Sequence, residues 1–182
     1  MSSAGSTRRG WLYGAAAMLA LAAGAGGVWL RARRNGPFID SPQEDFWARR
    51  FERPEGGEIV LQAMRGRPLL LNFWATWCPP CIEEMPMLDG FFRENASTGW
   101  QVVGLAIGQA PTIRTFLQRT PVSYPIGILD KENAEWMRQL GNTVAGLPFT
   151  LVLDAKGTVA IRKVGRVTAS DLQAWRHVQL QG

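Results

Sequence analysis

The sequence predicts an α/β fold, a central mixed sheet flanked by helices, which follows an N-terminal transmembrane helix or signal segment. Three observations lead to this prediction. Residues 11–30 carry no charged side chain. From residue 58 onward, apolar segments of strand length alternate with segments of helical pattern, and the last two strands are close enough in sequence to form a hairpin. Finally, a Cys-x-x-Cys pair directly follows a nearly continuous apolar strand.

The positive charge of the chain belongs to its N-terminal region. The 182 residues carry a formal net charge of +5. Residues 1–35 contain five arginines and no acidic residue, so the remaining chain has 15 basic and 15 acidic residues. A neutral folded part has no basic stripe to follow phosphates, and we therefore expect no nucleic-acid binding.

The N-terminal third predicts an export or membrane segment followed by a linker. We expect a basic tail over residues 1–10, a transmembrane signal-anchor over 11–30, a linker and lead-in over 31–57, and one folded domain over 58–182. Twenty helical residues span roughly 30 Å, the thickness of a bilayer core. Because the span is rich in Ala and Gly, a signal peptide that is removed after export stays open as the alternative.

The first folded elements surround the most apolar strand. Residues 41–44 have the pattern of a capping box that opens a short helix, whereas Phe46 to Phe51 fit an edge strand, which we favour slightly. A short apolar segment follows over 58–64. Residues 69–75 then form a nearly continuous apolar run, which is typical of a buried central strand.

The remaining elements alternate along the chain. Pro79 and Pro80 suit the first turn of a helix that runs to about residue 95. A strand over 100–107, a helix over 112–119, an extended segment over 123–129 and a helix over 131–140 come next. Strands over 150–153 and 158–164 form the hairpin. Thr168 is the expected cap of a closing helix that runs to about residue 180.

The chemistry of the chain is concentrated in Cys78 and Cys81, its two cysteines. Disulfide exchange needs a reachable thiolate and a second thiol that resolves the mixed disulfide. Cys78, ahead of the helix, is favoured as thiolate by the helix dipole, and Cys81, one turn in, acts second. A structural zinc site needs four ligands, and the chain adds only His177 to the two cysteines. We expect no metal and no cofactor.

A CxxC pair at the junction between a central strand and the following helix is the arrangement of the thioredoxin fold. Residues 71–81 (Leu-Asn-Phe-Trp-Ala-Thr-Trp-Cys-Pro-Pro-Cys), followed by Glu84-Met85-Pro86, resemble the TlpA/ResA-like branch of exported thioredoxin-fold proteins, over nearly all of residues 58–180. This resemblance implies a membrane-tethered thiol:disulfide oxidoreductase that reduces client proteins, such as apocytochrome c or copper-site assembly proteins. It also implies a transmembrane thiol carrier as electron donor.

The resemblance assigns further site residues. Gly146-Leu147-Pro148 matches the family's cis-proline loop opposite the CxxC, where Pro148 exposes the Leu147 backbone for pairing with an extended client. The alternative is an ordinary turn proline. We expect Trp77, Pro79 and Pro80 to complete the client-binding surface and Trp74 to lie in the core. Pro86 matches a proline with a structural role within the helix.

Asn72 departs from general thioredoxins, which place a buried acid at this position. Glu84, one helical turn after Cys81, matches an acid of the ResA-like subgroup. A partly buried carboxylate with a raised pKa accepts the proton of Cys81 during resolution, so Glu84 joins Cys78 and Cys81 as a candidate catalytic residue. The alternative, held equally open, is a surface glutamate like Glu83.

The redox chemistry favours a location in the periplasm, because disulfides form and break there. We expect the domain to face the periplasm from the inner membrane, or to be soluble in the periplasm if the leader is cleaved. A copper(I) metallochaperone and a disulfide-forming oxidant are the alternative functions. A peroxiredoxin is disfavoured because Ala75, three residues before Cys78, stands where that chemistry needs Thr or Ser.

Overall fold

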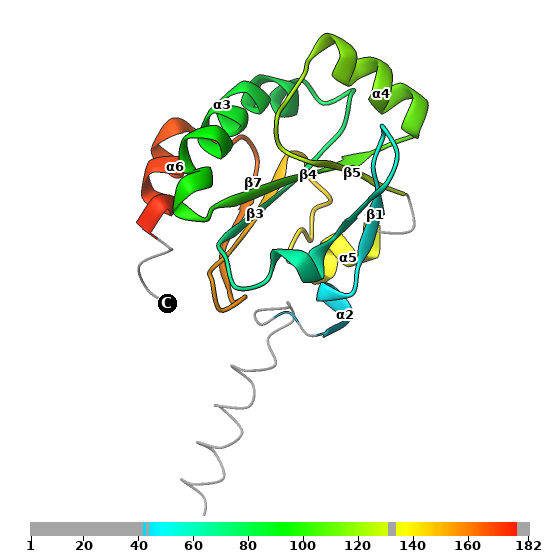
Figure 1. The fold of residues 1–182 in the computed structure, drawn as a ribbon. Helices are drawn as coiled ribbons and strands as arrows, with labels where there is room; N and C mark the ends of the chain where they lie inside the picture. Colours follow the sequence, from blue (N-terminus) through cyan, green and yellow to red (C-terminus); the bar gives the residue numbers. More distant parts are fainter. Residues whose placement is uncertain (1–41, 43, 131–133, 178–182) are drawn as a thin grey trace, which may run out of the picture. The chain divides into compact units, whose positions relative to one another are not determined.

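The five-stranded sheet is mixed, as the sequence predicts. A computed structural model describes residues 42, 44–130 and 134–177. The strand order is β5-β4-β3-β6-β7 (Figure 1). Parallel pairing joins β3 (Leu69–Trp74), β4 (Gln101–Ile107) and β5 (Ile126–Leu129). Antiparallel pairing adds β6 (Phe149–Leu153) and β7 (Val159–Val164), the predicted hairpin.

The central strand β3 is buried along its whole length. All six of its residues are inaccessible, and it pairs with β4 on one side and β6 on the other. Its side chains alternate between two core clusters: Leu69, Leu71 and Phe73 enter one, and Leu70 and Trp74 enter the other. This alternation is the period of two that a strand imposes, and here both faces of the sheet are covered.

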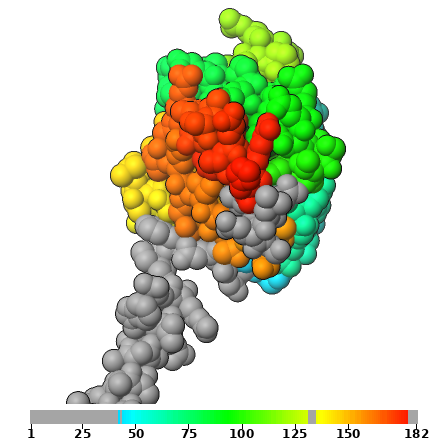
Figure 2. All heavy atoms as spheres, turned by 90° about the vertical axis from the view of Figure 1, so that its left-hand side faces the viewer, coloured from blue at the N-terminus to red at the C-terminus, as the bar shows by residue number. Residues whose placement is uncertain are grey.

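One face of the sheet is covered by three helices, which include the longest helix within the described residues. The helices α3 (Pro79–Asn95), α4 (Ala110–Arg119) and α6 (Ala169–Trp175) pack on the cluster that contains Trp74 and both cysteines. A short 3-10 segment, η2 (Ala96–Thr98), extends α3. Figure 2 shows α6 seated beside α3 at the surface, and ion pairs join the two regions, Arg166 with Glu83 and Arg176 with Glu94.

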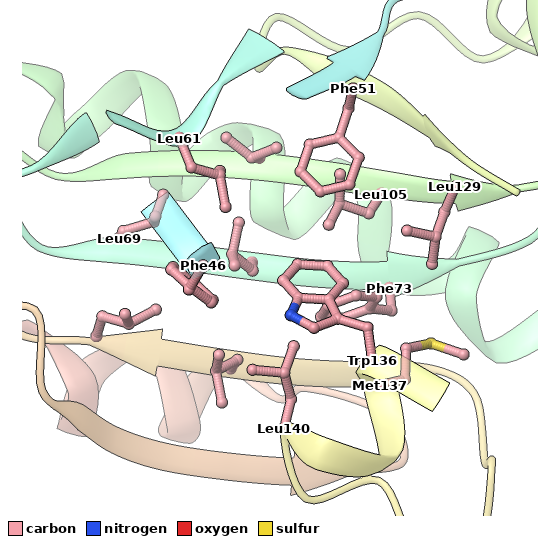
Figure 3. Close-up of a cluster of buried hydrophobic side chains, with 14 of the residues drawn as sticks. Phe46, Phe51, Leu61, Leu69, Phe73, Leu105, Leu129, Trp136, Met137 and Leu140 are labelled. Atoms are coloured by element: carbon pink, nitrogen blue, oxygen red, sulfur yellow. The ribbon is translucent and has the colours of Figure 1, made fainter. Parts of the chain in front are cut away.

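The other face is covered by α5 (Ala134–Gln139) and by elements from residues 44–64. Trp136 lies at the centre of this cluster (Figure 3). Its ring centroid is 5.7 Å from those of Phe46 and Phe73 and 5.6 Å from that of Phe51. Aromatic rings at these separations contribute beyond the area that they bury.

The lead-in contains both of the structures that the sequence left open. Residues Glu44–Trp47 form the helix α2, and Arg50–Glu52 form the strand β1, antiparallel to β2 (Glu58–Val60). A 3-10 turn, η1 (Leu61–Met64), follows. The preference for a strand from Phe46 onward was wrong for Phe46 and Trp47, because the helix turns both rings into the core. The expected cap at residues 41 and 43 lies outside the described residues.

The later elements match the prediction within a few residues. Thr168 caps α6 through a reciprocal capping box with Asp171, as its position predicted. Parts of the predicted helices over 131–140 and 168–180 lie outside the described residues, as do the basic tail and the predicted span over 11–30. Within the part of the chain that the structure describes, no helix combines the length and the apolar character needed to cross a bilayer.

Candidate active site

The two cysteines form a disulfide at the start of α3. Strand β3 ends at Trp74, and a tight turn brings Cys78 to the N-cap of the helix, where its N–H donates to Ala75 O at 3.1 Å. The N–H groups of Cys81 and Ile82 donate to Cys78 O. Cys78 is 4 % exposed and Cys81 is completely buried. Of the two sulfurs, that of Cys78 is therefore the one an incoming thiol can reach.

Two prolines follow the first cysteine, at the first two helical positions. Pro79 and Pro80 have no N–H, so two of the donors that a helix N-terminus normally offers are missing beside Cys78. The first N–H of the helix, that of Cys81, already bonds to Cys78 O. The helix dipole is then the main contribution of α3 to a Cys78 thiolate.

Trp77 and Trp74 differ as the sequence predicted. The Trp77 side chain is 70 % exposed, directly before the reachable cysteine, whereas Trp74 is fully buried. Among the described residues, two further large apolar side chains are exposed, Val144 and Val164. They flank Gly146, because a Cβ at that glycine would lie 2.7 Å from Val164 Cγ1 and 3.5 Å from Val144 Cγ2. Sequence reasoning missed both valines, since each reads as an ordinary apolar residue.

The Leu147–Pro148 peptide bond is cis, as the resemblance implies. Leu147 is half-buried and packs against both core clusters, including the one that contains Cys78 and Cys81. Pro148 O accepts a hydrogen bond from Gly165 N–H at 2.8 Å. The loop before Pro148 is fastened by the buried Asn142, whose side chain bonds both to the N–H and to the carbonyl of Gly146. Asn142 is a third residue that sequence reasoning missed.

Glu84 is completely buried, so the surface alternative for this residue was wrong. Its Oε1 accepts from Asn72 Nδ2 at 2.7 Å, and its Oε2 accepts from the N–H of Val167 at 2.6 Å. Burial raises the pKa of the Glu84 carboxyl to about 7, although these two hydrogen bonds favour the ionised form. Its neighbour Glu83 is exposed and pairs with Arg166. A buried carboxyl that titrates near neutral pH thus stands one turn after Cys81.

Asn72 takes the place of the acid that general thioredoxins bury, but its side chain is hydrogen-bonded to the buried acid Glu84. Its Nδ2 also donates to Thr150 Oγ1 at 3.1 Å, and both side chains are buried. The sequence drew attention to Asn72 as a departure, whereas nothing in it pointed to Thr150 or Val167. Val167 lies 83 residues from Glu84 in the sequence, and only the fold brings them together.

His177 is exposed. Among the described residues, no three His, Cys, Asp or Glu side chains gather as metal ligands.

Beside the active-site turn, Thr76 and five residues of α4 line a hollow of about 450 Å³, open to solvent. Those five residues are Pro111, Thr112, Thr115, Phe116 and Arg119.

The mixed sheet, the disulfide at the helix start and the cis-proline loop define a thiol:disulfide oxidoreductase of the thioredoxin fold. A family model described as Redoxin matches residues 42–174, and the chain belongs to this family.

Relatives and solved structures agree with this class. The chain is 33% identical over 124 residues to the thioredoxin-like protein YneN of Bacillus subtilis (strain 168), covering 65% of this chain and 68% of that protein. It is 30% identical over 128 residues to the thiol-disulfide oxidoreductase ResA of Geobacillus kaustophilus (strain HTA426), covering 69% of each. It is also similar to the crystal structure of a thioredoxin-related protein from Neisseria meningitidis serogroup B. That match has a TM-score of 0.62 and 33% identity and covers 71% of this chain and 96% of the other.

Proposed function

We propose that this protein reduces disulfides of client proteins in the periplasm, tethered to the inner membrane by residues 11–30 or released from it by cleavage. The observation that carries the proposal is the buried Glu84, whose pKa is raised to about 7, one turn after Cys81. In the reducing direction Cys81 must lose its proton to release the client. The Glu84 carboxyl can accept that proton near neutral pH, and the TlpA/ResA resemblance favours the reducing direction.

The exchange proceeds in two displacements. The Cys78 thiolate attacks one sulfur of the client disulfide, and the other client sulfur leaves as a thiolate and takes up a proton. Cys81 then gives its proton to Glu84, attacks the Cys78 sulfur and displaces the first client sulfur as a thiolate, which takes up the proton that Glu84 received. Two electrons pass to the client, which leaves as a dithiol, and Cys78 and Cys81 end as the disulfide. A transmembrane thiol carrier restores the dithiol.

Client docking falls on the surface around Cys78. The backbone of Leu147, before the cis-Pro148, pairs with an extended client segment, as the TlpA/ResA resemblance implies for this loop. Trp77, with Pro79 and Pro80, supplies apolar contact next to the reacting sulfur. The two exposed valines beside Gly146 extend this surface. Apocytochrome c and copper-site assembly proteins are the client classes that the TlpA/ResA resemblance favours.

The direction of transfer is tested by the reduction potential of the Cys78–Cys81 pair in the full-length protein. Tryptophan fluorescence is followed against defined dithiol buffers, with Cys81→Ser as the control that forms no intramolecular disulfide. A potential near or below roughly −220 mV supports a reductant. A value near roughly −120 mV makes the protein an oxidant of client thiols and overturns the proposed direction.

A further inference from the structure

The side-chain amide of Asn72 forms hydrogen bonds with one end only. Its Nδ2 donates to Glu84 Oε1 at 2.7 Å and to Thr150 Oγ1 at 3.1 Å. Its Oδ1 is buried and has no hydrogen-bond partner among the described residues. A buried amide oxygen without a partner destabilises a folded protein, and an apolar side chain on this apolar strand avoids that cost. The presence of an amide here therefore calls for a reason other than stability.

Both partners of Nδ2 can change from acceptor to donor. A carboxylate only accepts hydrogen bonds, whereas a carboxylic acid also has an O–H to donate, and a threonine hydroxyl does either. A half-turn of the Asn72 amide exchanges its nitrogen and oxygen, which have nearly the same size. After the half-turn, Oδ1 accepts from the Glu84 acid and from the Thr150 hydroxyl. The two hydrogen bonds thus exist in both protonation states of Glu84.

We propose that Asn72 is a positioning residue for proton transfer from Cys81 to Glu84, because its amide reverses its ends as the carboxyl gains or loses the proton. This inference rests on the proposed role of Glu84. The N–H of Val167 holds Oε2, so the carboxyl keeps its place while the proton arrives at Oε1. The proton leaves the Cys81 sulfur as that sulfur attacks Cys78, and it is then available to the departing client thiolate.

The other ionisable groups around Glu84 act on it from a greater distance. Lys163 on β7 and Arg166 in the loop before α6 favour its ionised form through their charge, and each is paired with another carboxylate, Asp171 and Glu83. Tyr124, which precedes β5, is buried, and burial raises the pKa of its hydroxyl well above the ordinary value, so it stays neutral. Asn72 and Val167 supply the hydrogen bonds to the two carboxyl oxygens.

An infrared titration of the full-length protein tests the inference. The band of the protonated Glu84 carboxyl is assigned by its loss in Glu84→Gln, and its pH midpoint is compared among variants. Asn72→Leu removes a hydrogen bond from both forms of Glu84, but the bond to the carboxylate is charge-assisted and stronger than the bond to the acid, so we expect the midpoint to rise by roughly one pH unit. Thr150→Val keeps the shape without the hydroxyl and raises the midpoint by roughly half a unit. Thr150→Ser, which retains the hydroxyl, is the matched control and leaves the midpoint in place.

An unchanged midpoint in Thr150→Val, and in Asn72→Leu if that variant folds, reduces Asn72 to a structural residue and overturns the inference. The reversal has its own readout. Nuclear Overhauser contacts between the Asn72 amide protons and the Thr150 methyl group are expected above the midpoint and lost below it, whereas contacts that persist at both pH values contradict the reversal. If Glu84→Gln leaves the pH profile of disulfide exchange unchanged, the proposed role of Glu84 itself fails, whatever the midpoints are.

Discussion

At the scale of single residues, Glu83 and Glu84 are adjacent on one helix but lie in different environments, and only the second is suited to accept a proton near neutral pH. Glu83 is exposed and paired with Arg166, while Glu84 is buried, with a pKa raised to about 7. Successive helical residues point about 100° apart, so adjacent glutamates reach different environments. The pair therefore offers a matched control for any experiment on the buried acid.

Glu84→Gln is expected to slow resolution of the mixed disulfide by roughly tenfold to a hundredfold at pH 8, because Cys81 loses its proton acceptor. The wild-type rate rises as pH passes through about 7, where Glu84 ionises, and the variant loses this inflection. Stopped-flow mixing of the reduced protein with a client disulfide at pH 5 to 9 measures both effects. Glu83→Gln is expected to keep the wild-type profile; the same loss in both variants would argue for a general charge effect instead.

The same carboxyl predicts that the folded state becomes less stable as pH rises. The folded pKa of about 7 lies above the ordinary value of 4.5, so between these values the native state binds more protons than the unfolded state. The contribution of Glu84 to the free energy of unfolding is then greatest below about pH 4.5. It falls as the pH rises through 7, by on the order of 3 kcal/mol in total. Urea unfolding of wild type and Glu84→Gln at pH 5 and pH 8 measures the slope. An equal slope in the two proteins would show that another group causes it.

The residues that the sequence did not reveal are those whose role depends on distant partners. Cys78, Cys81 and Trp77 follow from local pattern, since the motif itself places them at a helix start. The burial of Glu84 depends on Val167 and Asn72, at separations of 83 and 12 residues. Local periodicity carries no information about such contacts, which is why a surface glutamate and a buried acid were equally open.

At the scale of elements, the loop that precedes the cis-proline depends on one buried side chain. Asn142 binds both the N–H and the carbonyl of Gly146, and Ala145 between them has a positive φ of 51°. Such a conformation is uncommon for a residue with a Cβ and needs support from its surroundings. Asn142 thus fixes the path of the chain into Leu147 and Pro148.

Asn142→Ala is expected to lower kcat/KM for a protein client by roughly tenfold, because two hydrogen bonds of about 1 kcal/mol each no longer hold the client-pairing loop. The reaction with a small disulfide that makes no backbone pairing should change little. Parallel assays with a protein client and with a small aromatic disulfide separate these effects. Thr143→Ala, at the exposed neighbouring position, is the control; an equal loss with both substrates in Asn142→Ala would mean that the cysteines themselves have been disturbed.

Element prediction succeeded where one segment contains the whole signal. The strand β3 is apolar except for Asn72, and α3 starts at two prolines, so both were placed within a residue or two. The helix α2 has four residues, too few to establish a period, and its aromatic side chains equally suit a strand. Packing against Trp136 decides that choice, and such packing belongs to the tertiary structure.

At the scale of the whole molecule, the residues before β2 complete one of the two cores. The sequence analysis placed residues 31–57 in a linker and lead-in, yet Phe46, Trp47 and Phe51 are all buried in the cluster around Trp136. Each large side chain of this kind stabilises a core by several kcal/mol. We therefore propose that the folding unit begins near residue 42, ahead of β2.

A chain that begins at residue 58 is expected to lose its cooperative unfolding transition, because removing three buried aromatic side chains costs at least about 5 kcal/mol, comparable to the whole stability of a small domain. A chain that begins at residue 42 should retain the transition. Thermal unfolding followed by near-UV circular dichroism compares the two. Equal melting temperatures of the two chains would show that residues 58–182 fold without the residues before them.

The hydrogen bond between Glu84 and Val167 also determines when the active site is completed during synthesis of the chain. Residues 78 and 81 leave the ribosome long before residue 167, since synthesis runs from the N-terminus. Until the C-terminal hairpin and the turn into α6 have docked, the Glu84 carboxyl lacks one of the donors that hold it in place. The proton acceptor is therefore completed only after residue 167 has been synthesised, and until then the growing chain carries two thiols without the buried carboxyl that accepts the proton of Cys81.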